Sequence, residues 1–305
     1  MLKFENLSLE NKEKFNSFMK GRGYRHAEAS FANLFMWQEV WDIQVVFDDY
    51  ALYMKMDSEI YKPFLLPPYL YNFDDPIKPG LEKIDEYMEE YHMGFDVKCV
   101  IPRYMEKIQN ECPGEYIFTL DEPNSEYMYN TRDLATLEGK KYHSKRNHIN
   151  KLLKDHDFEY IKYTHDMKSI CLDIHERWME EKNIEGSEDA TEEYETTLKA
   201  LNNFEKLDLE GCIIKIDGEP CAFSLGERLC DDTALVLVEK AVKYDGLYQL
   251  INREFVAREW SDTKFINREE DMGIEGLRKA KQSYYPAYML ERYDMVKANG
   301  NKKAL

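Results

Sequence analysis

The sequence has few cysteines and none in a metal-binding or redox spacing. Six cysteines occur in 305 residues, and no two form a Cys-x-x-Cys pair. A zinc ribbon and a dithiol redox motif are therefore excluded, and we interpret the cysteines as reduced, mostly buried thiols. The seven histidines lack the spacing of metal ligands, so we predict no metal site. P-loop, His-Glu-x-x-His and Gly-x-Ser-x-Gly motifs are absent, which excludes the common nucleotide-binding, zinc-protease and serine-hydrolase classes.

Long apolar runs are also missing. No stretch approaches the roughly 20 apolar residues that span a bilayer, and the opening MLKFENLSLENKEKF lacks the apolar core of a signal peptide. We therefore expect a cytoplasmic protein without stable membrane insertion.

Positive charge is scarce, because 41 Lys and Arg face 59 Asp and Glu, for a formal net charge of -18. Such an excess repels nucleic acids and anionic lipid surfaces at long range. Residues 139–154 are the exception, with six Lys or Arg and no carboxylate. This basic segment suits a small phosphorylated ligand better than a long nucleic acid. The alternative is a solvated helix face that pairs with neighbouring acids.

Residues 1–130 mix helical and strand patterns. Helical spacing begins in KFNSFMKGRGY, and the runs IQVVF and ALYMKM predict a hairpin around Asp48 and Asp49. YKPFLLPPYLYNFDDPIKPG predicts loop or edge strand, because proline has no N–H to donate. LEKIDEYMEEYHMG predicts an amphipathic helix that ends at Gly94, and VKCVI and EYIFTL predict further strands. We identify no catalytic constellation in this half.

The second half alternates helices and strands more plainly. ICLDIHERWMEEK and TLKALNNF predict helices, and Asp217-Gly218 predicts the turn of a hairpin. TALVLVEKA (strand), YDGLYQLINREFVAREW (helix), KFINREED (strand), GIEGLRKAKQSYY (helix) and AYMLERYDMV (strand) follow. This order is that of the GNAT acyltransferase fold, in which a mixed sheet opens at its middle.

Four segments carry a closer resemblance: SFANLFMWQEVW, TLEGKKYHSKRNHINK, EKAVKYDGLYQLINREF and INREEDMGIEGLRKAKQSYYP. They look like the uncharacterised bacterial family related to the C-terminal domain of phosphatidylglycerol lysyltransferases. The resemblance implies an α+β fold with two GNAT-like domains in tandem, each a mixed, mainly antiparallel sheet flanked by helices. We place these domains at residues 1–130 and 131–305. Without a Gly/Ser linker between them, we expect them to be packed together.

The turn after TALVLVEKA opens a helix with Gly246. Helix N-termini have unpaired N–H groups and a partial positive charge, so they bind phosphate when glycine lets the backbone come close. The GNAT resemblance implies that a Q/R-x-x-G-x-G/A loop here holds the pyrophosphate of coenzyme A. The cofactor-binding residues that it implies are Val238, Lys243, Tyr244, Asp245, Gly246, Leu247, Tyr248 and Asn267. The alternative is that Asp245 and Gly246 serve only as a turn and helix cap.

Glu239 is the candidate catalytic base, because TALVLVEKA is apolar on both faces and delivers this carboxylate to the end of a central strand. Partial burial would raise its pKa, as a base that deprotonates an amine requires. The alternative is a buried ion pair with Arg278 or Lys281. The GNAT resemblance also implies a tyrosine that protonates the departing thiolate, and Tyr284 or Tyr285 stands at the matching place.

A helix over Lys140–Lys154 would turn Lys141, Lys145, His148 and Lys151 outward as one stripe. We expect this stripe to bind phosphates, either of coenzyme A or of the terminal nucleotides of a tRNA. Arg146 falls among the apolar positions of the helix. We assign it, with Arg278 and Lys281, to structural ion pairs.

Three hypotheses follow for function. The first is transfer of an acyl group from coenzyme A to a small amine or peptide acceptor, without a metal. The second, implied by the lysyltransferase resemblance, is aminoacyl transfer from aminoacyl-tRNA to a lipid, peptide or protein, which the net charge disfavours. The third is a non-catalytic binding protein.

Overall fold

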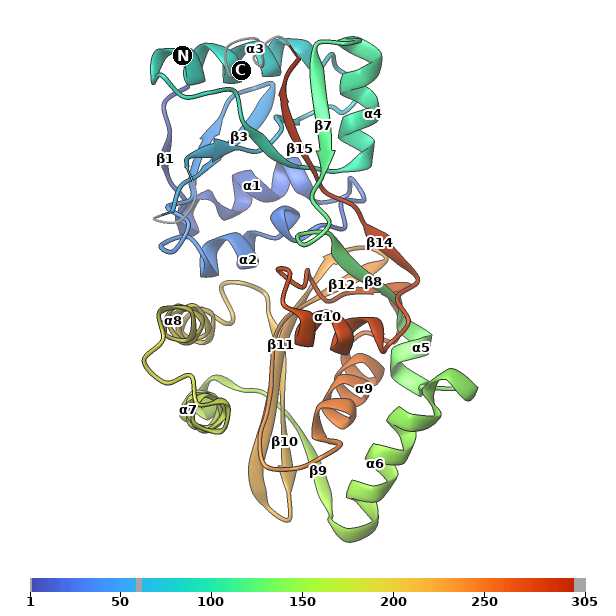
Figure 1. Ribbon diagram of the computed structural model, residues 1–305. Coiled ribbons are helices and arrows are strands. Elements are labelled where there is room, and N and C mark those ends of the chain that lie inside the picture. The colour runs from blue at the N-terminus through green and yellow to red at the C-terminus, as the bar shows by residue number, and fades with distance from the viewer. Residues whose placement is uncertain (1, 59–61, 299–305) are drawn as a thin grey trace.

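The computed structural model describes residues 2–58 and 62–298. Within these residues two mixed sheets, each flanked by helices, lie one above the other in Figure 1. The predicted α+β class is confirmed. In this described part of the chain, no helix has both the length and the apolar composition to cross a membrane.

The first sheet is built mainly from the N-terminal half. Its strand order is β1 (Glu5–Asn6), β2 (Gln44–Phe47), β3 (Ala51–Met56), β4 (Phe64–Leu65), β6 (Val97–Val100), β15 (Tyr293–Lys297) and β7 (Tyr116–Leu120), and β5 (Tyr69–Leu70) pairs with β3. Its helices are α1 (Lys12–Met19), α2 (Phe31–Met36), α3 (Lys78–Glu90) and α4 (Pro102–Glu111). The hairpin predicted around Asp48 is present as β2 and β3, and the proline-rich segment forms only the short β4 and β5. Helix α4 was not predicted from the sequence.

The second sheet has the order β14 (Tyr288–Leu290), β8 (Glu126–Asn130), β13 (Phe265–Asn267), β12 (Thr233–Ala241), β11 (Glu219–Cys230), β10 (Glu210–Ile216) and β9 (Phe158–Lys162). Helices α7 (Lys168–Lys182) and α8 (Glu188–Asn202) cover one face in Figure 1. The other face carries α5 (Thr131–Thr136), α6 (His143–Asp155), α9 (Leu247–Glu259) and α10 (Glu275–Gln282). Asp217 and Gly218 both have positive φ, so the predicted hairpin turn between β10 and β11 is confirmed.

The last predicted strand, AYMLERYDMV, is in fact two strands in different sheets. β14 pairs with β8 in the second sheet, whereas β15 lies between β6 and β7 in the first. β8, which precedes residue 131, likewise belongs to the second sheet. The chain therefore crosses between the sheets near both ends of the second half.

Arg292, at the crossing between β14 and β15, joins three segments in a buried charge network. Its Nη2 donates to Glu28 at 2.9 Å and also to Glu126. Glu126 further accepts the backbone N–H of Ala27 at 3.0 Å and the side-chain amide of Asn267. All three charged side chains are buried. The two halves are thus joined by a guanidinium whose Nη2 meets both carboxylates only when both sheets are in place.

We predict that Arg292→Met lowers the free energy of unfolding by about 3–5 kcal/mol, because it leaves two buried carboxylates without their cation. Urea unfolding followed by fluorescence measures the loss. Arg132→Met is the matched control, since it breaks the solvent-exposed pair with Glu138 and should change stability little. Equal losses in the two variants would contradict the role given to Arg292.

Candidate active site

Strands β12 and β13 pair over only a short length and then diverge. Their parallel pairing joins Thr233–Leu235 to Phe265–Asn267, whereas β12 continues to Ala241. Beyond Leu235, β11 is the only strand that pairs with β12 within the described residues. The sheet therefore opens at its middle, as the sequence predicts, and Glu239 lies on the part of β12 that pairs with β11 but no longer with β13.

Glu239 is bound by two side chains that the sequence analysis did not single out. Nη2 of Arg268, just after β13, donates to Oε1 of Glu239 at 3.0 Å. Nδ2 of Asn252, on α9, donates to Oε2 at 3.2 Å. Burial raises the pKa of Glu239, although the positive charge of Arg268 and the hydrogen bond from Asn252 oppose the shift. The carboxylate is thus a stronger base than a solvated glutamate.

Two buried polar atoms beside Glu239 have no hydrogen-bond partner in the described part of the chain: Nη1 of Arg268 and Oδ1 of Asn252. Leaving such atoms unpaired costs about 1–3 kcal/mol each. They offer one donor and one acceptor next to the carboxylate.

Aromatic and lysine side chains complete the cluster around Arg268. The ring of Tyr284 lies 5.0 Å from the guanidinium carbon, and Nζ of Lys145 lies 4.1 Å from the same ring. Burial raises the pKa of Tyr284, so its hydroxyl stays protonated at neutral pH. Burial and the charge of Arg268 lower the pKa of Lys145. Lys145, expected on an outward stripe, instead donates to Ser283 at 2.6 Å.

The ion pairs differ from those expected. Arg278 pairs with Asp271 at 2.9 Å rather than with Glu239. Nζ of Lys281 donates to the carbonyl oxygens of Arg268, at 2.6 Å, and of Glu270. Arg146 donates to the carbonyl oxygens of Leu137 and Gly139, and neither it nor Lys281 has an ion pair in the described residues. Arg146 and Lys281 therefore hydrogen-bond to backbone carbonyl oxygens rather than to carboxylates.

The turn at Gly246 is covered by α6. Gly246 has φ +91°, and a Cβ built on it would lie 2.6 Å from the carbonyl oxygen of His148. The imidazole Nδ1 of His148 bonds the Asp245 carboxylate at 3.1 Å. Close packing of two helices and a left-handed backbone therefore require glycine here, independent of any phosphate.

The other predicted cofactor-binding residues are dispersed around this turn and the strand ends. Lys243 pairs with Glu219 at 2.6 Å, and Tyr244 packs on the ring of His156. Val238 and Leu247 are buried, and Asn267 bonds Glu126 and the Arg25 carbonyl oxygen. Tyr248 lies near Glu239; burial of Tyr248 and the charge of Glu239 raise the pKa of Tyr248 to about 12.

The remaining predicted residues lie on the surface. Tyr285 is exposed and packs on Tyr142, and Lys141 pairs with Asp133 at 3.2 Å. Lys151 is exposed on α6. Among the described residues, no group of three or more His, Cys, Asp or Glu side chains is arranged to hold a metal ion.

On the opposite face of β12, Lys240 is buried against α7 and α8. Its Nζ lies 2.5 Å from Glu193 and 3.4 Å from the centre of the Trp178 ring. Because successive strand residues alternate faces, Glu239 and Lys240 point to opposite sides of the sheet. A lysine directly after the strand's glutamate could have signalled this second cluster.

The family described as "Phosphatidylglycerol lysyltransferase, C-terminal" matches this chain over residues 22–296. The chain belongs to this family. A crystal structure of a conserved protein of unknown function from Bacteroides thetaiotaomicron VPI-5482 is 35% identical, covers 97% of this chain and 99% of its own, and has a TM-score of 0.90. The structure of L-PGS from Bacillus licheniformis is 14% identical, covers 97% of this chain and 93% of its own, and has a TM-score of 0.64.

A tandem GNAT protein from the clavulanic acid biosynthesis pathway shares the fold at lower similarity. It is 9% identical, covers 98% of this chain and 99% of its own, and has a TM-score of 0.53. The predicted family and the GNAT-like fold are therefore both confirmed for this lysyltransferase-family chain.

We predict that Gly246→Ala destabilises the protein by about 1–3 kcal/mol, because a Cβ at positive φ is strained and would meet the His148 carbonyl oxygen. The matched control is Gly276→Ala in α10, where a Cβ meets open space. Removing glycine from a helix should stabilise by roughly 0.5–1 kcal/mol. Thermal unfolding measures both, and shifts of the same sign would refute the packing explanation.

Proposed function

We propose that this protein transfers an aminoacyl group from aminoacyl-tRNA to an amine or hydroxyl group of a lipid, peptide or protein. The observation that carries the proposal is the family match over residues 22–296, whose description is that of a lysyltransferase. It favours the second hypothesis of the sequence analysis over coenzyme A. The cluster at Glu239 supplies chemistry suited to such a transfer.

In the proposed reaction Glu239 takes the proton of the acceptor nucleophile. The nucleophile forms a bond to the ester carbonyl carbon of the donor, and the bond from that carbon to the ribose oxygen breaks. The unpartnered N–H of Arg268 can stabilise the negative charge that develops on the carbonyl oxygen. Tyr284, protonated at neutral pH, can return a proton to the departing ribose oxygen.

The structure of the turn at Gly246 favours binding of coenzyme A less than the sequence of that turn does. The His148 carbonyl oxygen stands beside Gly246, and the Asp245 carboxylate lies in the same turn. Both are negative or partly negative, and both oppose a pyrophosphate there. Lys243, the expected first residue of the loop, is engaged by Glu219.

The exposed side of α6 supports a tRNA donor. Lys151 and Lys154 on α6, and Lys140 in the turn just before it, are exposed, and none of the three has an ion pair in the parts of the chain that are described. Figure 1 shows α6 at the outer edge of the second half. A polyanion can meet these lysines locally although the whole protein carries a net charge of -18.

We predict that Glu239→Gln lowers kcat/KM for transfer by roughly 100- to 10,000-fold, the range of a lost general base. Because only the ionised carboxylate is a base, kcat/KM of the wild type should rise with pH through the raised pKa of Glu239. In the Glu239→Gln variant, kcat/KM should not show this rise with pH. Transfer is measured with tRNA charged with labelled amino acids and with phosphatidylglycerol vesicles, peptides and protein as acceptors.

The matched control is Glu254→Gln, which alters another arginine-bound carboxylate with little exposure, on α9. It should leave the rate and its pH profile unchanged. Transfer from labelled acetyl-coenzyme A but not from tRNA would overturn the donor assignment. An unchanged pH profile in a folded Glu239→Gln protein would overturn the base.

We also predict that replacing Lys140, Lys151 and Lys154 together by Gln weakens tRNA binding. The slope of log K against log salt should become shallower by roughly 1 for each contact removed. Filter binding over a salt series measures the slope. Replacing Lys20, Lys62 and Lys206, three exposed lysines outside α6, is the control, and an equal effect would show that α6 is not the contact.

A further inference from the structure

The first sheet ends in a strand that has a free edge. β7 pairs with β15 on one side, and no strand of the described residues pairs with its other side. Its sequence, YIFTL, contains neither a charge nor a proline, and the pairing with β15 runs over the whole strand without a bulge. Proteins usually protect an edge strand with lysine, proline or a bulge. The edge of β7 lacks these protections and can accept a further strand.

The pairing with β15 shows which backbone groups face this edge. The N–H of Asp121 donates to the carbonyl oxygen of Arg292 at 2.8 Å, and at the other end the N–H of Ala298 donates to that of Glu115 at 2.9 Å. Hydrogen-bonded and non-bonded pairs alternate along an antiparallel ladder. Every second residue from Glu115 to Asp121 therefore bonds to β15. The residues between them direct their N–H and C=O groups to the free edge: Tyr116, Phe118 and Leu120.

Exposed apolar side chains gather around the end of β7. Seven large apolar or aromatic side chains are exposed in the described residues, and four of them belong to this region: Ile117, Leu120, Met272 and Ile274. The segment with Met272 adjoins β7, because its N–H donates to the carbonyl oxygen of Pro123 at 3.0 Å. Ile117 and Leu120 lie on opposite faces of β7, so a strand added to the edge would contact both. Such an apolar patch is typical of a protein interaction site.

A pocket with negative charge continues from the end of β7. Its volume is about 240 Å³, and its lining includes Leu120 and three carboxylates, Glu122, Asp271 and Glu291, but no Lys or Arg. Asp271 is paired with Arg278 at 2.9 Å. Glu122 and Glu291 have no ion pair in the part of the chain that the structure describes. This acidic pocket can therefore receive a basic side chain from a segment that runs along β7.

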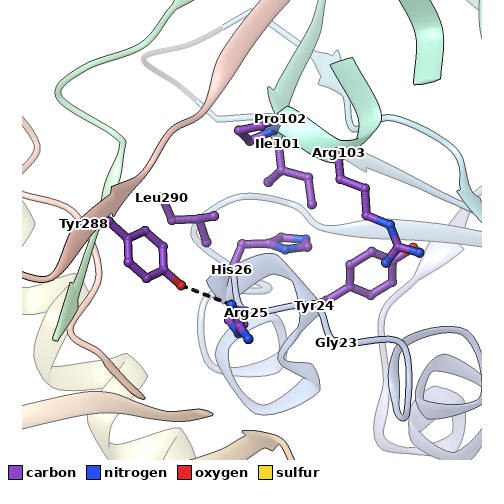
Figure 2. A pocket seen from close by; sticks show the side chains of 9 residues that line it. All are labelled: Gly23, Tyr24, Arg25, His26, Ile101, Pro102, Arg103, Tyr288 and Leu290. Carbon is purple, nitrogen blue, oxygen red and sulfur yellow. Dashed lines mark hydrogen bonds between the residues drawn. The ribbon is translucent and has the colours of Figure 1, made fainter. Parts of the chain in front are cut away.

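The acidic pocket lies on one face of β14. Met289 and, just after the strand, Glu291 line it. Tyr288 and Leu290 instead line a separate cavity, shown in Figure 2, because successive strand residues point to opposite faces. The hydroxyl of Tyr293 donates to Glu291 at 2.6 Å but leaves its charge uncompensated. None of the residues that line the acidic pocket belongs to the proposed catalytic cluster, so this site is independent of the proposed reaction.

We propose that β7 and the acidic pocket bind an extended segment of a partner protein, which adds to the first sheet as a further strand and places a Lys or Arg side chain in the pocket. The backbone groups of Tyr116, Phe118 and Leu120 supply the hydrogen bonds of such strand addition. The carboxylates of Glu122 and Glu291 select a basic residue and exclude an acidic one. The net charge of -18 attracts a basic partner at long range.

A second copy of this chain fits the edge less well. Antiparallel pairing of β7 with itself around Phe118 would match the outward backbone groups, but it would place Glu115 opposite Asp121 of the other copy. Like charges directly opposite each other destabilise a strand pair. Residues 112–122 contain no Lys or Arg, so the added strand would bring no cation to the acidic pocket. Charge complementarity therefore favours a basic segment of another protein.

Amide hydrogen exchange of the free protein, followed by NMR, tests the edge itself. The amides of Ile117 and Thr119 should be protected, because they bond to β15. Those of Tyr116, Phe118 and Leu120 should exchange roughly 10-fold faster or more, since they have no strand partner. Equal protection along β7 would show that the edge is already covered, and would overturn the proposal.

An array of synthetic peptides tests the partner. Valine and threonine alternate in each peptide, and one arginine, glutamine or glutamate is placed at each position in turn. We expect the full chain to bind an arginine peptide saturably in fluorescence anisotropy and to bind its glutamate counterpart roughly 10-fold more weakly. Bound peptide should also slow exchange of the outward amides of β7. Binding of no arginine peptide, or equal binding of the glutamate peptides, overturns the proposal.

Two pairs of variants separate the backbone from the charge. Leu120→Pro removes an outward N–H that β15 does not use, so it should fold, as thermal unfolding verifies, and bind the arginine peptide roughly 10-fold more weakly than Leu120→Ala. Glu122→Gln combined with Glu291→Gln should weaken binding roughly 10-fold. Glu185→Gln combined with Glu195→Gln is the matched control, because it removes two exposed carboxylates elsewhere, and should leave binding unchanged.

The remaining outcomes also decide the proposal. Equal losses in the two double variants, or equal binding by Leu120→Pro and Leu120→Ala, contradict it. Sedimentation equilibrium of the wild type without peptide should show a monomer. A dimer that Leu120→Pro dissociates would assign the edge of β7 to a second copy of this chain and overturn the assignment to a basic partner.

Discussion

The short parallel pairing of β12 with β13 is the constraint on which the site depends. Three residues of each strand pair, and of the six that complete β12, five have a partner in β11 only and Leu237 lies at an irregularity of that pairing. A strand edge inside a protein must be filled, because water is excluded and unpaired polar groups are costly. Arg268 fills part of this opening from the end of β13, and α9 contributes Asn252. Arg268 and Asn252 therefore reach the carboxylate of Glu239 through the space that opens where the two strands separate.

Arginine has a consistent role in this acidic chain. Four buried or nearly buried carboxylates are met by a guanidinium: Glu239 by Arg268, Glu126 and Glu28 by Arg292, and Asp271 by Arg278. The planar guanidinium can satisfy several acceptors at once, which suits it to such positions. Lys151 and Lys154 on α6, and Lys140 just before it, have no carboxylate partner in the described residues. Cations that are not needed to neutralise the interior thus mark the surfaces proposed to meet anions.

The sequence predicted the order of elements from α7 to β14 but not the contacts of the site. Periodicity and the Asp217-Gly218 turn give the order from α7 to β14, and the apolar run TALVLVEKA identifies the central strand that carries Glu239. Arg268 and Asn252 could not be assigned, because their partner lies 29 and 13 residues away and depends on the separation of two strands. Lys145 was expected outward because helical spacing does not reveal that Ser283 and Tyr284 cover that side of α6. The division of AYMLERYDMV into two strands could not be predicted either, because it occurs beside Arg292, whose buried partners belong to distant segments.

The contact between α6 and the start of α9 links the fold to the choice of donor. In a GNAT-like sheet the positive end of the helix after the central strand attracts phosphate when it is open to solvent. Here the carbonyl oxygen of His148 supplies partial negative charge at that end, and the Asp245 carboxylate adds to it. A donor whose anionic groups lie along an extended chain, rather than in one pyrophosphate, can instead meet the exposed lysines of α6. Helix α6 therefore covers the phosphate position at Gly246 and exposes lysines at which a different anionic donor can bind. For this reason the choice between coenzyme A and tRNA depends on α6 rather than on Glu239.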